Sequence, residues 1–285
     1  MEENIRKEII RFVSESRDNR FPESDDRYFD EPLVGFAAAD DPLFLRYKEI
    51  IGDFHLTPHE LMAEGQSGQF QGTVISWVLP ITSSTRVSNR NETRYPSRQW
   101  AQTRSFGEDF NCVLRRHIEQ YLTNFGYRAL APQVHPAWRA FPDSPVGIAS
   151  TWSERHAAYA CGLGTFSLSD ALITPKGIAH RCGSIITDLK LTPSSRHHSD
   201  HRLNCLYFRE ESCGLCMTRC PVGAITPMGH DKVRCRELVY GEAPKAVGEL
   251  YGVPHTGCGL CQTKVPCEAC IPKGRVSVSN PDGGD

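Results

Sequence analysis

CGLCMTRCPVGAI, residues 213–225, is the stretch that decides how the last third of this chain folds. It places three cysteines at C-x2-C-x3-C spacing and follows the last of them with proline. A second group, CGLCQTKVPCEAC at residues 258–270, carries four more, and Cys205 and Cys235 bring the total to nine within 66 positions. The amino-terminus lacks an apolar signal segment, which predicts a reducing, cytoplasmic location. Clustered cysteines in such a compartment bind metal and do not form disulfides.

The first group has the spacing of an iron–sulfur protein. In bacterial ferredoxins the run is C-x2-C-x2-C-x3-C-P, and its last cysteine binds the other cluster of a two-cluster module. Cys213, Cys216 and Cys220 match the last three positions, whereas the first would be Glu210. Cys205, eight residues before Cys213, is the natural substitute across a longer loop. The spacing therefore predicts a ferredoxin-like module with two [4Fe–4S] clusters.

The ligands of the two predicted clusters cross between the cysteine groups, as they do in ferredoxins. The last ligand of such a pattern lies about four residues after a C-x2-C pair. This favours Cys267 over Cys270 for closing the first cluster, although the choice between them stays open. The predicted ligands are Cys205, Cys213, Cys216 and Cys267 for the first cluster, and Cys220, Cys235, Cys258 and Cys261 for the second.

Zinc is the alternative for these cysteines, because C-x2-C pairs also build zinc ribbons. The Cys-Pro pair, the x3 spacing and the lack of histidine partners favour iron–sulfur clusters. Three isolated cysteines, Cys112, Cys161 and Cys182, are expected to be buried as small apolar side chains. The histidine-rich segment 197–201 has no ordered ligand spacing and predicts a solvated loop.

Composition bounds the rest of the chain. The protein has 285 residues, 39% of them hydrophobic and 23% charged, with a formal net charge of −2. These values are those of an ordinary globular protein, without a global basic field for nucleic acid and without an apolar run that could span a membrane. The polar segment 192–204 and the sharp rise in cysteine content predict a domain boundary there. We expect an α+β domain of layered α/β type over residues 1–200, a ferredoxin-like domain over 201–272 and a flexible tail over 273–285.

Hydrophobic periodicity and capping signals predict the elements of the first domain. Helices are expected at 5–13, 108–124 and 153–161. Two more are expected to begin at the N-cap Asp41 and at the capping box of residues 57–60. Strands are expected at 72–81, 128–131 and 183–189. The polar stretch Asn91–Phe106 lacks periodicity and is long for a passive connection, which predicts a binding loop.

Five stretches of the chain are similar to one enzyme family. They are GEDFNCVLRRHIEQYL (107–122), SERHAAYACGLGTF (153–166), LITPKG (172–177), GSIITDL (183–189) and CMTRCPVGAI (216–225). Together they resemble epoxyqueuosine reductase, which belongs with the reductive dehalogenases, over roughly residues 100–272. The chain is expected to be a relative of that enzyme and not its ortholog.

The resemblance implies a nitroreductase-like α/β domain that binds cobalamin in its base-off form. It also implies two [4Fe–4S] clusters that pass single electrons to the cobalt for a reductive cleavage. The implied ligand set is the one given above, with Cys235 as the cysteine between the family's two motifs.

The candidate site includes Arg155 of the Glu154-Arg155 pair and residues that follow it in the sequence. Arg155, His156 and Tyr159 are candidate catalytic residues, as proton donors or contacts to cofactor amides and phosphates. Gly162, Gly164 and Thr165 are candidate corrinoid contacts, because glycine has no Cβ to obstruct a large cofactor. Each of these residues also has a structural alternative. Arg155 and His156 could be solvated residues of a helix face, Tyr159 a core aromatic ring, and residues 162–165 a helix C-cap followed by a turn.

Three features depart from the family. Its epoxyqueuosine reductases carry an aspartate proton donor before the Glu-Arg pair, where this chain has VGIAS (146–150); Asp143 is close but out of register. Those enzymes often extend past the clusters with a helical-repeat region that helps to hold tRNA, whereas this chain ends within about fifteen residues of Cys270. The slightly acidic charge is also unsuited to many phosphate contacts. These departures do not favour tRNA as the substrate.

We therefore predict a cobalamin-dependent iron–sulfur oxidoreductase acting on a small-molecule or modified-base substrate. Its electrons would come from an external one-electron donor of ferredoxin or flavodoxin type. The alternative is a non-enzymatic electron-transfer protein with two clusters and no corrinoid, which the missing acid supports. A zinc-stapled binding module is a third possibility.

Overall fold

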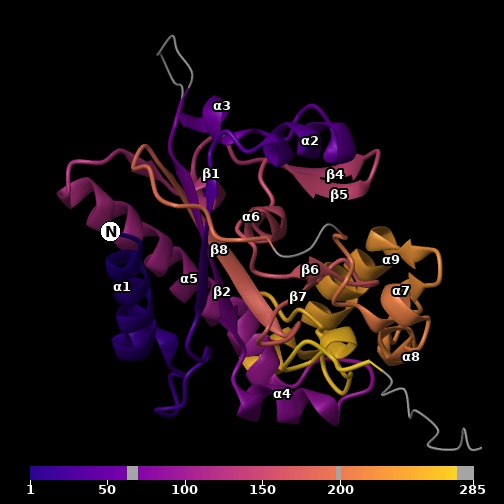
Figure 1. Ribbon diagram of the computed structural model, residues 1–285. Helices are drawn as coiled ribbons and strands as arrows, with labels where there is room; N and C mark the ends of the chain where they lie inside the picture. The colour runs from indigo at the N-terminus through magenta and orange to yellow at the C-terminus, as the bar shows by residue number, and fades with distance from the viewer. Residues whose placement is uncertain (63–69, 197–199, 275–285) are drawn as a thin grey trace, which may run out of the picture.

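The computed structural model describes residues 1–62, 70–196 and 200–274 (Figure 1). Its centre is a four-stranded antiparallel sheet in the order β1-β2-β8-β3. The strands are β1 (Leu33–Ala38), β2 (Thr73–Pro80), β8 (His180–Thr187) and β3 (Ala129–Leu130). The predicted strand at 72–81 is confirmed as β2, which is buried along its whole length because it pairs with strands on both sides.

Helices cover both faces of this sheet (Figure 1). On one face lie α1 (Glu2–Glu15) and α5 (Arg98–Asn124); on the other lie α2 (Pro42–Ile51), α3 (Pro58–Met62) and α6 (Glu154–Ala160). Alternate side chains of β2 enter the two cores, with Ile75 and Trp77 in the first and Val74 and Val78 in the second. The mixed helix-and-sheet class predicted for this part of the chain is confirmed.

The capping signals of the sequence form as predicted. Asp41 accepts a hydrogen bond from the backbone N–H of Leu43 at 3.0 Å and begins α2. At α3, the Glu60 carboxylate accepts from the Thr57 N–H at 2.7 Å, and the Thr57 hydroxyl accepts from the Glu60 N–H at 3.2 Å. These reciprocal bonds are a capping box.

The binding loop predicted for Asn91–Phe106 is wrong over most of its length. Helix α5 begins at Arg98, where the Ser97 hydroxyl accepts from the Trp100 N–H at 3.2 Å. Polar residues of this first part, such as Thr103 and Ser105, are buried. The Ser105 hydroxyl, for example, donates to the His255 carbonyl of the cysteine-rich part at 2.7 Å, and polar residues buried in this way leave no hydrophobic periodicity in the sequence.

Shorter elements complete the chain. Outside the sheet are α4 (Ser83–Arg90), the hairpin of β4 (Ala140–Ser144) and β5 (Gly147–Ser150), the pair β6 (Thr165–Phe166) and β7 (Leu172–Ile173), and 3-10 turns at Arg17–Asn19 and Pro132–Val134. The cysteine module, as we call residues 205–270, contains α7 (Leu206–Glu210), α8 (Leu215–Arg219), β9 (Ile225–Thr226), β10 (Gly229–His230), α9 (Lys232–Arg236), π-helical turns at Glu237–Glu242 and Pro244–Gly248, α10 (Glu249–Tyr251) and a 3-10 turn at Leu260–Gln262.

The cysteine module has its own small core. Apolar side chains of the loop before and after β7 pack there against Cys205, Ile225 and Val265. In Figure 1 the module, orange to yellow, lies beside β6 and β7 and below the β4–β5 hairpin. Within residues 1–62, 70–196 and 200–274, no helix combines the length and apolar character that crossing a bilayer requires. The tail predicted for 273–285 lies, from residue 275, outside the described residues.

We expect His55 to make the protein less stable in acid. The side chain is only 1% exposed and neither ring nitrogen has a hydrogen-bond partner among the described residues. Burial, together with the positive charge of Lys48, lowers the pKa of His55 to about 4. Below the ordinary histidine pKa of about 6.5 the unfolded chain takes up a proton that the folded chain excludes, so stability falls as the pH drops towards 4.

Between pH 7.5 and 5 this difference should cost about 2 kcal/mol of the free energy of unfolding. His55→Phe, which keeps an aromatic ring beside Trp152, should lose less stability over that interval. Urea unfolding of both proteins at the two pH values measures the difference. An equal loss in both proteins would contradict the assignment.

Candidate functional site

A cavity of about 590 Å³ lies between the sheet domain and the cysteine module. Its walls come from α2, α6, the loop at 166–170 and the segment 201–208, and from β10 and α9 of the module. Part of the wall is apolar, including side chains of Ile50, Phe166 and Phe208. A cavity of this size, with apolar walls and a few convergent polar groups, has the usual form of a ligand site.

Helix α6 brings the three candidate catalytic residues, Arg155, His156 and Tyr159, to this cavity. The Nδ1 atom of His156 lies 2.7 Å from the Ser153 hydroxyl, and its carbonyl accepts a hydrogen bond from the Tyr47 hydroxyl at 3.0 Å. Burial and the neighbouring charge of Arg155 lower the pKa of His156 to about 3, so its ring is neutral at pH 7. Burial raises the pKa of Tyr159, so its phenol keeps its proton.

The cavity also contains an acid that the sequence did not reveal. Asp170 lines the cavity from the turn after β6 and has a positive φ of 58°, which is uncommon outside glycine. Its carboxylate lies 3.4 Å from the His230 Nδ1 and 4.0 Å from the Lys232 Nζ. Although burial alone would raise the pKa of Asp170, His230, Arg155 and Lys232 lower it, and the carboxylate is ionised at neutral pH.

Asp170 follows the Glu154-Arg155 pair in the sequence, whereas the aspartate of the family's pattern precedes that pair. Asp143 is exposed on β4 and does not line the cavity, whereas Val146, in the turn before β5, does. The Ser-Leu-Ser-Asp turn at 167–170, between two short apolar strands, is the sequence signal that could have identified the acid.

Positive charge dominates the cavity wall. Arg46, Arg155, Arg202 and Lys232 line it, against the single carboxylate of Asp170. Across the described part of the chain, no ion pair joins Arg46, Arg155 or Arg202 to a carboxylate. Arg202 lies over the Phe208 ring at 4.2 Å. A cleft lined by one sign of charge concentrates ligands of the opposite sign.

The four cysteines predicted for the first cluster meet at a second, much smaller cavity. Cys205, Cys213, Cys216 and Cys267 all line this space of about 30 Å³. Burial raises the pKa of Cys267, and the other three thiols of the set raise it further. Cys270 is exposed and is not among the lining residues. The cavity therefore brings together the predicted set, with Cys267 and not Cys270.

The cysteines predicted for the second cluster also lie near one another. Burial raises the pKa of Cys258 to about 11, with further contributions from Cys235 and Cys220. Burial raises the pKa of Cys261 as well, and Cys258 and Cys235 add to that effect. Among the described residues, no group of three or more histidine, cysteine, aspartate or glutamate side chains is arranged to hold a single metal ion.

The predicted corrinoid contacts lie outside the lining of the large cavity. A Cβ on Gly162 would stand 2.7 Å from the Ser195 carbonyl oxygen, and one on Gly164 would stand 2.4 Å from the Ile173 carbonyl oxygen. Thr165 is buried and its hydroxyl accepts from the Asn204 N–H at 2.8 Å. The chain's own backbone thus occupies the space that these residues leave, and their role towards a corrinoid stays a prediction.

Two other expectations concern isolated cysteines and histidines. Cys161 and Cys182 are buried as predicted, whereas Cys112 is half-buried. Residues 197–199 of the histidine-rich segment lie outside the described residues. His201, its last residue, is exposed and contributes to the wall of the large cavity.

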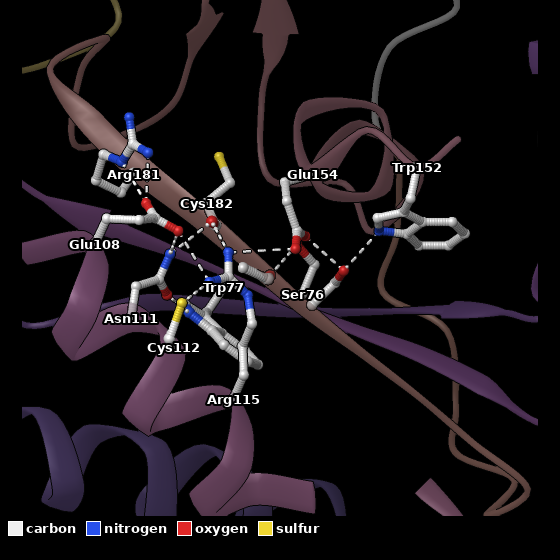
Figure 2. A network of polar contacts seen from close by, with 12 residues as sticks. Ser76, Trp77, Glu108, Asn111, Cys112, Arg115, Trp152, Glu154, Arg181 and Cys182 are labelled. Atoms are coloured by element: carbon white, nitrogen blue, oxygen red, sulfur yellow. Dashed lines mark hydrogen bonds and ion pairs between the residues drawn. The ribbon is translucent and has the colours of Figure 1, made fainter. Parts of the chain in front are cut away.

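A buried ionic network fixes α6, and with it the cavity, to the sheet (Figure 2). Arg115 of α5 is 1% exposed. Its guanidinium lies 3.3 Å from a carboxylate oxygen of Glu154, the first residue of α6, and donates a hydrogen bond to the Glu108 carboxylate at 2.9 Å. Glu108 is also bound by Arg181 of β8, and these two arginines lower its pKa to about 2 against the effect of burial. Glu154 in turn accepts from the Ser184 hydroxyl.

Comparison with known proteins places this fold. No protein-family model and no curated protein sequence matches the chain. Solved structures do match it, among them epoxyqueuosine reductase from Bacillus subtilis, at 18% identity and a TM-score of 0.53 over 93% of this chain and 66% of that one. An epoxyqueuosine reductase described with a tRNA-Tyr epoxyqueuosine-modified stem loop gives the same values.

A catabolic reductive dehalogenase matches at 16% identity and a TM-score of 0.52, over 84% of this chain and 30% of that one. The chain thus spans 66% of the length of the epoxyqueuosine reductases and a smaller share of the dehalogenase. The resemblance predicted from the sequence is confirmed for the fold: this chain is a structural relative of the epoxyqueuosine reductases and reductive dehalogenases.

Proposed function

We propose that this chain is a cobalamin-dependent iron–sulfur reductase that cleaves a bond of its substrate reductively. The observation that carries the proposal is the cavity of about 590 Å³, which has the α6 residues on one side and the cysteine module on the other. The fold of known reductases supports it. On this proposal residues 1–200 form a nitroreductase-like domain and residues 201–272 a ferredoxin-like domain.

The cysteines fit two [4Fe–4S] clusters by their chemistry. Eight thiols in two sets of four, without histidine, are the soft ligands that iron–sulfur clusters use. The backbone N–H of Ala224 donates to the Cys220 sulfur at 3.2 Å, which is the kind of hydrogen bond that tunes such clusters. Cys205, Cys213, Cys216 and Cys267 would hold the first cluster, and Cys220, Cys235, Cys258 and Cys261 the second.

The lining of the large cavity suits the corrin ring of a cobalamin. Its apolar wall suits the face of a macrocycle, and Arg155, His156 and Tyr159 offer polar atoms to the amides at a corrin edge. A bound cobalamin would supply a strongly reducing cobalt centre, fed one electron at a time by the clusters. Replacing a carbon–halogen or carbon–oxygen bond by carbon–hydrogen consumes two electrons and one proton, and the leaving group departs as an anion.

Side chains of this chain can donate that proton and bind that anion. Tyr159 keeps its phenolic proton because burial raises its pKa, and it can donate to a developing carbanion. The neutral ring of His156 is held by the Ser153 hydroxyl at Nδ1 and by an edge contact with the Tyr47 ring at 4.8 Å between centroids, and it can donate a hydrogen bond without adding charge. Arg155, which donates to the Asp170 backbone carbonyl and forms no ion pair with a carboxylate among the described residues, can receive the departing anion.

The arginines in the wall of the large cavity indicate the kind of substrate. Three arginines without carboxylate partners favour a substrate that carries a carboxylate or phosphate, either a small molecule or a modified base. The electrons would come from an external ferredoxin- or flavodoxin-type protein. The alternative, an electron carrier without corrinoid, has no need of a cavity of this size beside the cysteine module.

Anaerobic reconstitution tests the proposal. We expect about eight irons per chain and the visible spectrum of base-off cobalamin on titration with hydroxocobalamin. Four or fewer irons would contradict the two clusters. Full iron content without corrinoid binding at micromolar concentration would leave the electron carrier as the function.

A variant that fills the cavity should separate specific from non-specific corrinoid binding. Val146→Trp adds an indole at the cavity wall and should weaken hydroxocobalamin binding roughly tenfold or more, because the site loses space for the macrocycle. The matched control is Val134→Trp, at an exposed valine outside the lining. Titration followed by visible absorbance measures both, and equal affinities would argue against this cavity as the corrinoid site.

A further inference from the structure

Arg219 is a half-buried cation whose hydrogen bonds all go to neutral groups. Its guanidinium donates to the carbonyls of Asn89 at 3.2 Å, Glu92 at 2.9 Å, Leu260 at 3.2 Å and Thr263 at 3.1 Å. Among the described residues no carboxylate forms an ion pair with it. Backbone carbonyls satisfy its donors but leave its charge uncancelled.

This charge lies at the second set of cysteines. Arg219 precedes Cys220, and the Leu260 carbonyl that it binds directly precedes Cys261. The guanidinium is therefore close enough to the second set to stabilise negative charge there.

A second cation lies at the same loop. Arg104 of α5 lines a cavity together with Cys258, and a Cβ on the intervening Gly257 would stand 3.0 Å from the Arg104 Cγ. Glu108, the acid nearest to it on α5, is already bound by Arg115 and Arg181. Arg104 therefore adds a second positive charge at the loop that carries Cys258.

The first set has a different environment. No charged side chain is among the residues that line its small cavity, and the apolar residues there include Ile173, Ile178 and Val265. Arg209, on α7 after Cys205, forms an ion pair with Glu210 at 2.8 Å. Arg202, three residues before Cys205, also lacks a carboxylate partner among the described residues, but its guanidinium lies over the Phe208 ring at 4.2 Å and does not line the small cavity, so the lining of the first set holds no charge.

We propose that Arg219 gives the cluster held by Cys220, Cys235, Cys258 and Cys261 a higher reduction potential than the cluster held by Cys205, Cys213, Cys216 and Cys267. This inference rests on the two clusters of the proposed function. Each cluster gains one negative charge when it takes up an electron. A nearby uncancelled cation stabilises that charge, whereas an uncharged, apolar surrounding penalises it.

Redox titration of the reconstituted protein, followed by electron paramagnetic resonance with dithionite as reductant, tests the order. The wild type should show two midpoint potentials. In Arg219→Gln the higher one should move down towards the lower one, which stays unchanged. Arg219→Lys keeps a charge near the same place and should restore much of the separation. Lys245→Gln, at an exposed cation of the same module that adjoins no cysteine in the sequence, is the control and should change neither midpoint.

Iron content is measured on every sample, which separates this inference from the proposed function. A wild type with four or fewer irons per chain contradicts the two clusters themselves. With full iron content, an Arg219→Gln protein whose midpoints are unchanged, or which shift together, overturns the inference. If Arg219→Gln does not load its clusters, the order is tested in Cys267→Ser, which should retain the higher midpoint; retention of the lower one overturns it.

Discussion

Cys267→Ser should lose one of the two clusters, and with it about half of the iron. The reason is geometric, since Cys267 lines the same small cavity as Cys205, Cys213 and Cys216. A hydroxyl is a poor substitute for a thiolate towards iron, so the three remaining ligands should not retain the cluster under dilution. Iron and sulfide analysis after anaerobic reconstitution measures the loss, and electron paramagnetic resonance counts the remaining clusters.

Cys270→Ser is the matched control, three residues away in the same loop. Its sulfur is exposed and its closest polar partner is the Pro266 carbonyl at 4.0 Å. We expect this variant to keep the iron content of the wild type. The opposite outcome, with iron lost from Cys270→Ser and retained by Cys267→Ser, would reverse the ligand assignment. Loss from both would mean that the loop fails to fold around either substitution.

Arg115→Met should destabilise the protein by about 3–5 kcal/mol. Arg115 is buried between two carboxylates, and its removal leaves the buried Glu154 carboxyl, whose pKa burial already raises, with the Ser184 hydroxyl as its partner among the described residues. Glu108 keeps Arg181, so the cost should come mainly from Glu154 (Figure 2). In thermal unfolding of the reconstituted protein we expect a fall in Tm on the order of 10 °C.

The double variant Arg115→Met/Glu154→Gln tells a buried charge from a lost packing contact. It removes the charge that the single variant leaves unpaired and should recover a large part of the stability. Because Glu154 begins α6, Arg115→Met should also weaken cobalamin binding in the cavity that α6 lines. A double variant as unstable as Arg115→Met alone would show that the size of the arginine, and not its charge, matters here.

Local signals predicted much of the fold. The Asp41 cap and the capping box at 57–60 act through neighbours within four residues, so their hydrogen bonds could be predicted from sequence spacing. The strand β2 was recognisable because burial on both faces requires a continuous apolar run. The start of α5 was not, because several of its buried residues, such as Thr103 and Ser105, are polar, and the Ser105 hydroxyl donates to the His255 carbonyl at 2.7 Å.

Some residues of the candidate site could likewise be predicted from the sequence, and others could not. The pairing of cysteines into two sets follows from their spacing, since a cluster needs four thiolates within reach of one another. Arg155, His156 and Tyr159 could be named because they share one short helix. Asp170 could not, since it meets His230 only when a turn of the sheet domain folds against β10, sixty residues further along the chain.

The sequence by itself indicated the cysteine module, because the order and spacing of CGLCMTRCPVGAI are typical of iron–sulfur ligands, although spacing left the choice between Cys267 and Cys270 open. Tertiary structure alone decided what surrounds those thiols. The small uncharged cavity at Cys267, the uncancelled charge of Arg219 beside the second set and the arginine-rich cavity at α6 all join segments far apart in the chain. Spacing can specify the ligands of a metal site, whereas the charge and polarity around it depend on which distant segments pack there.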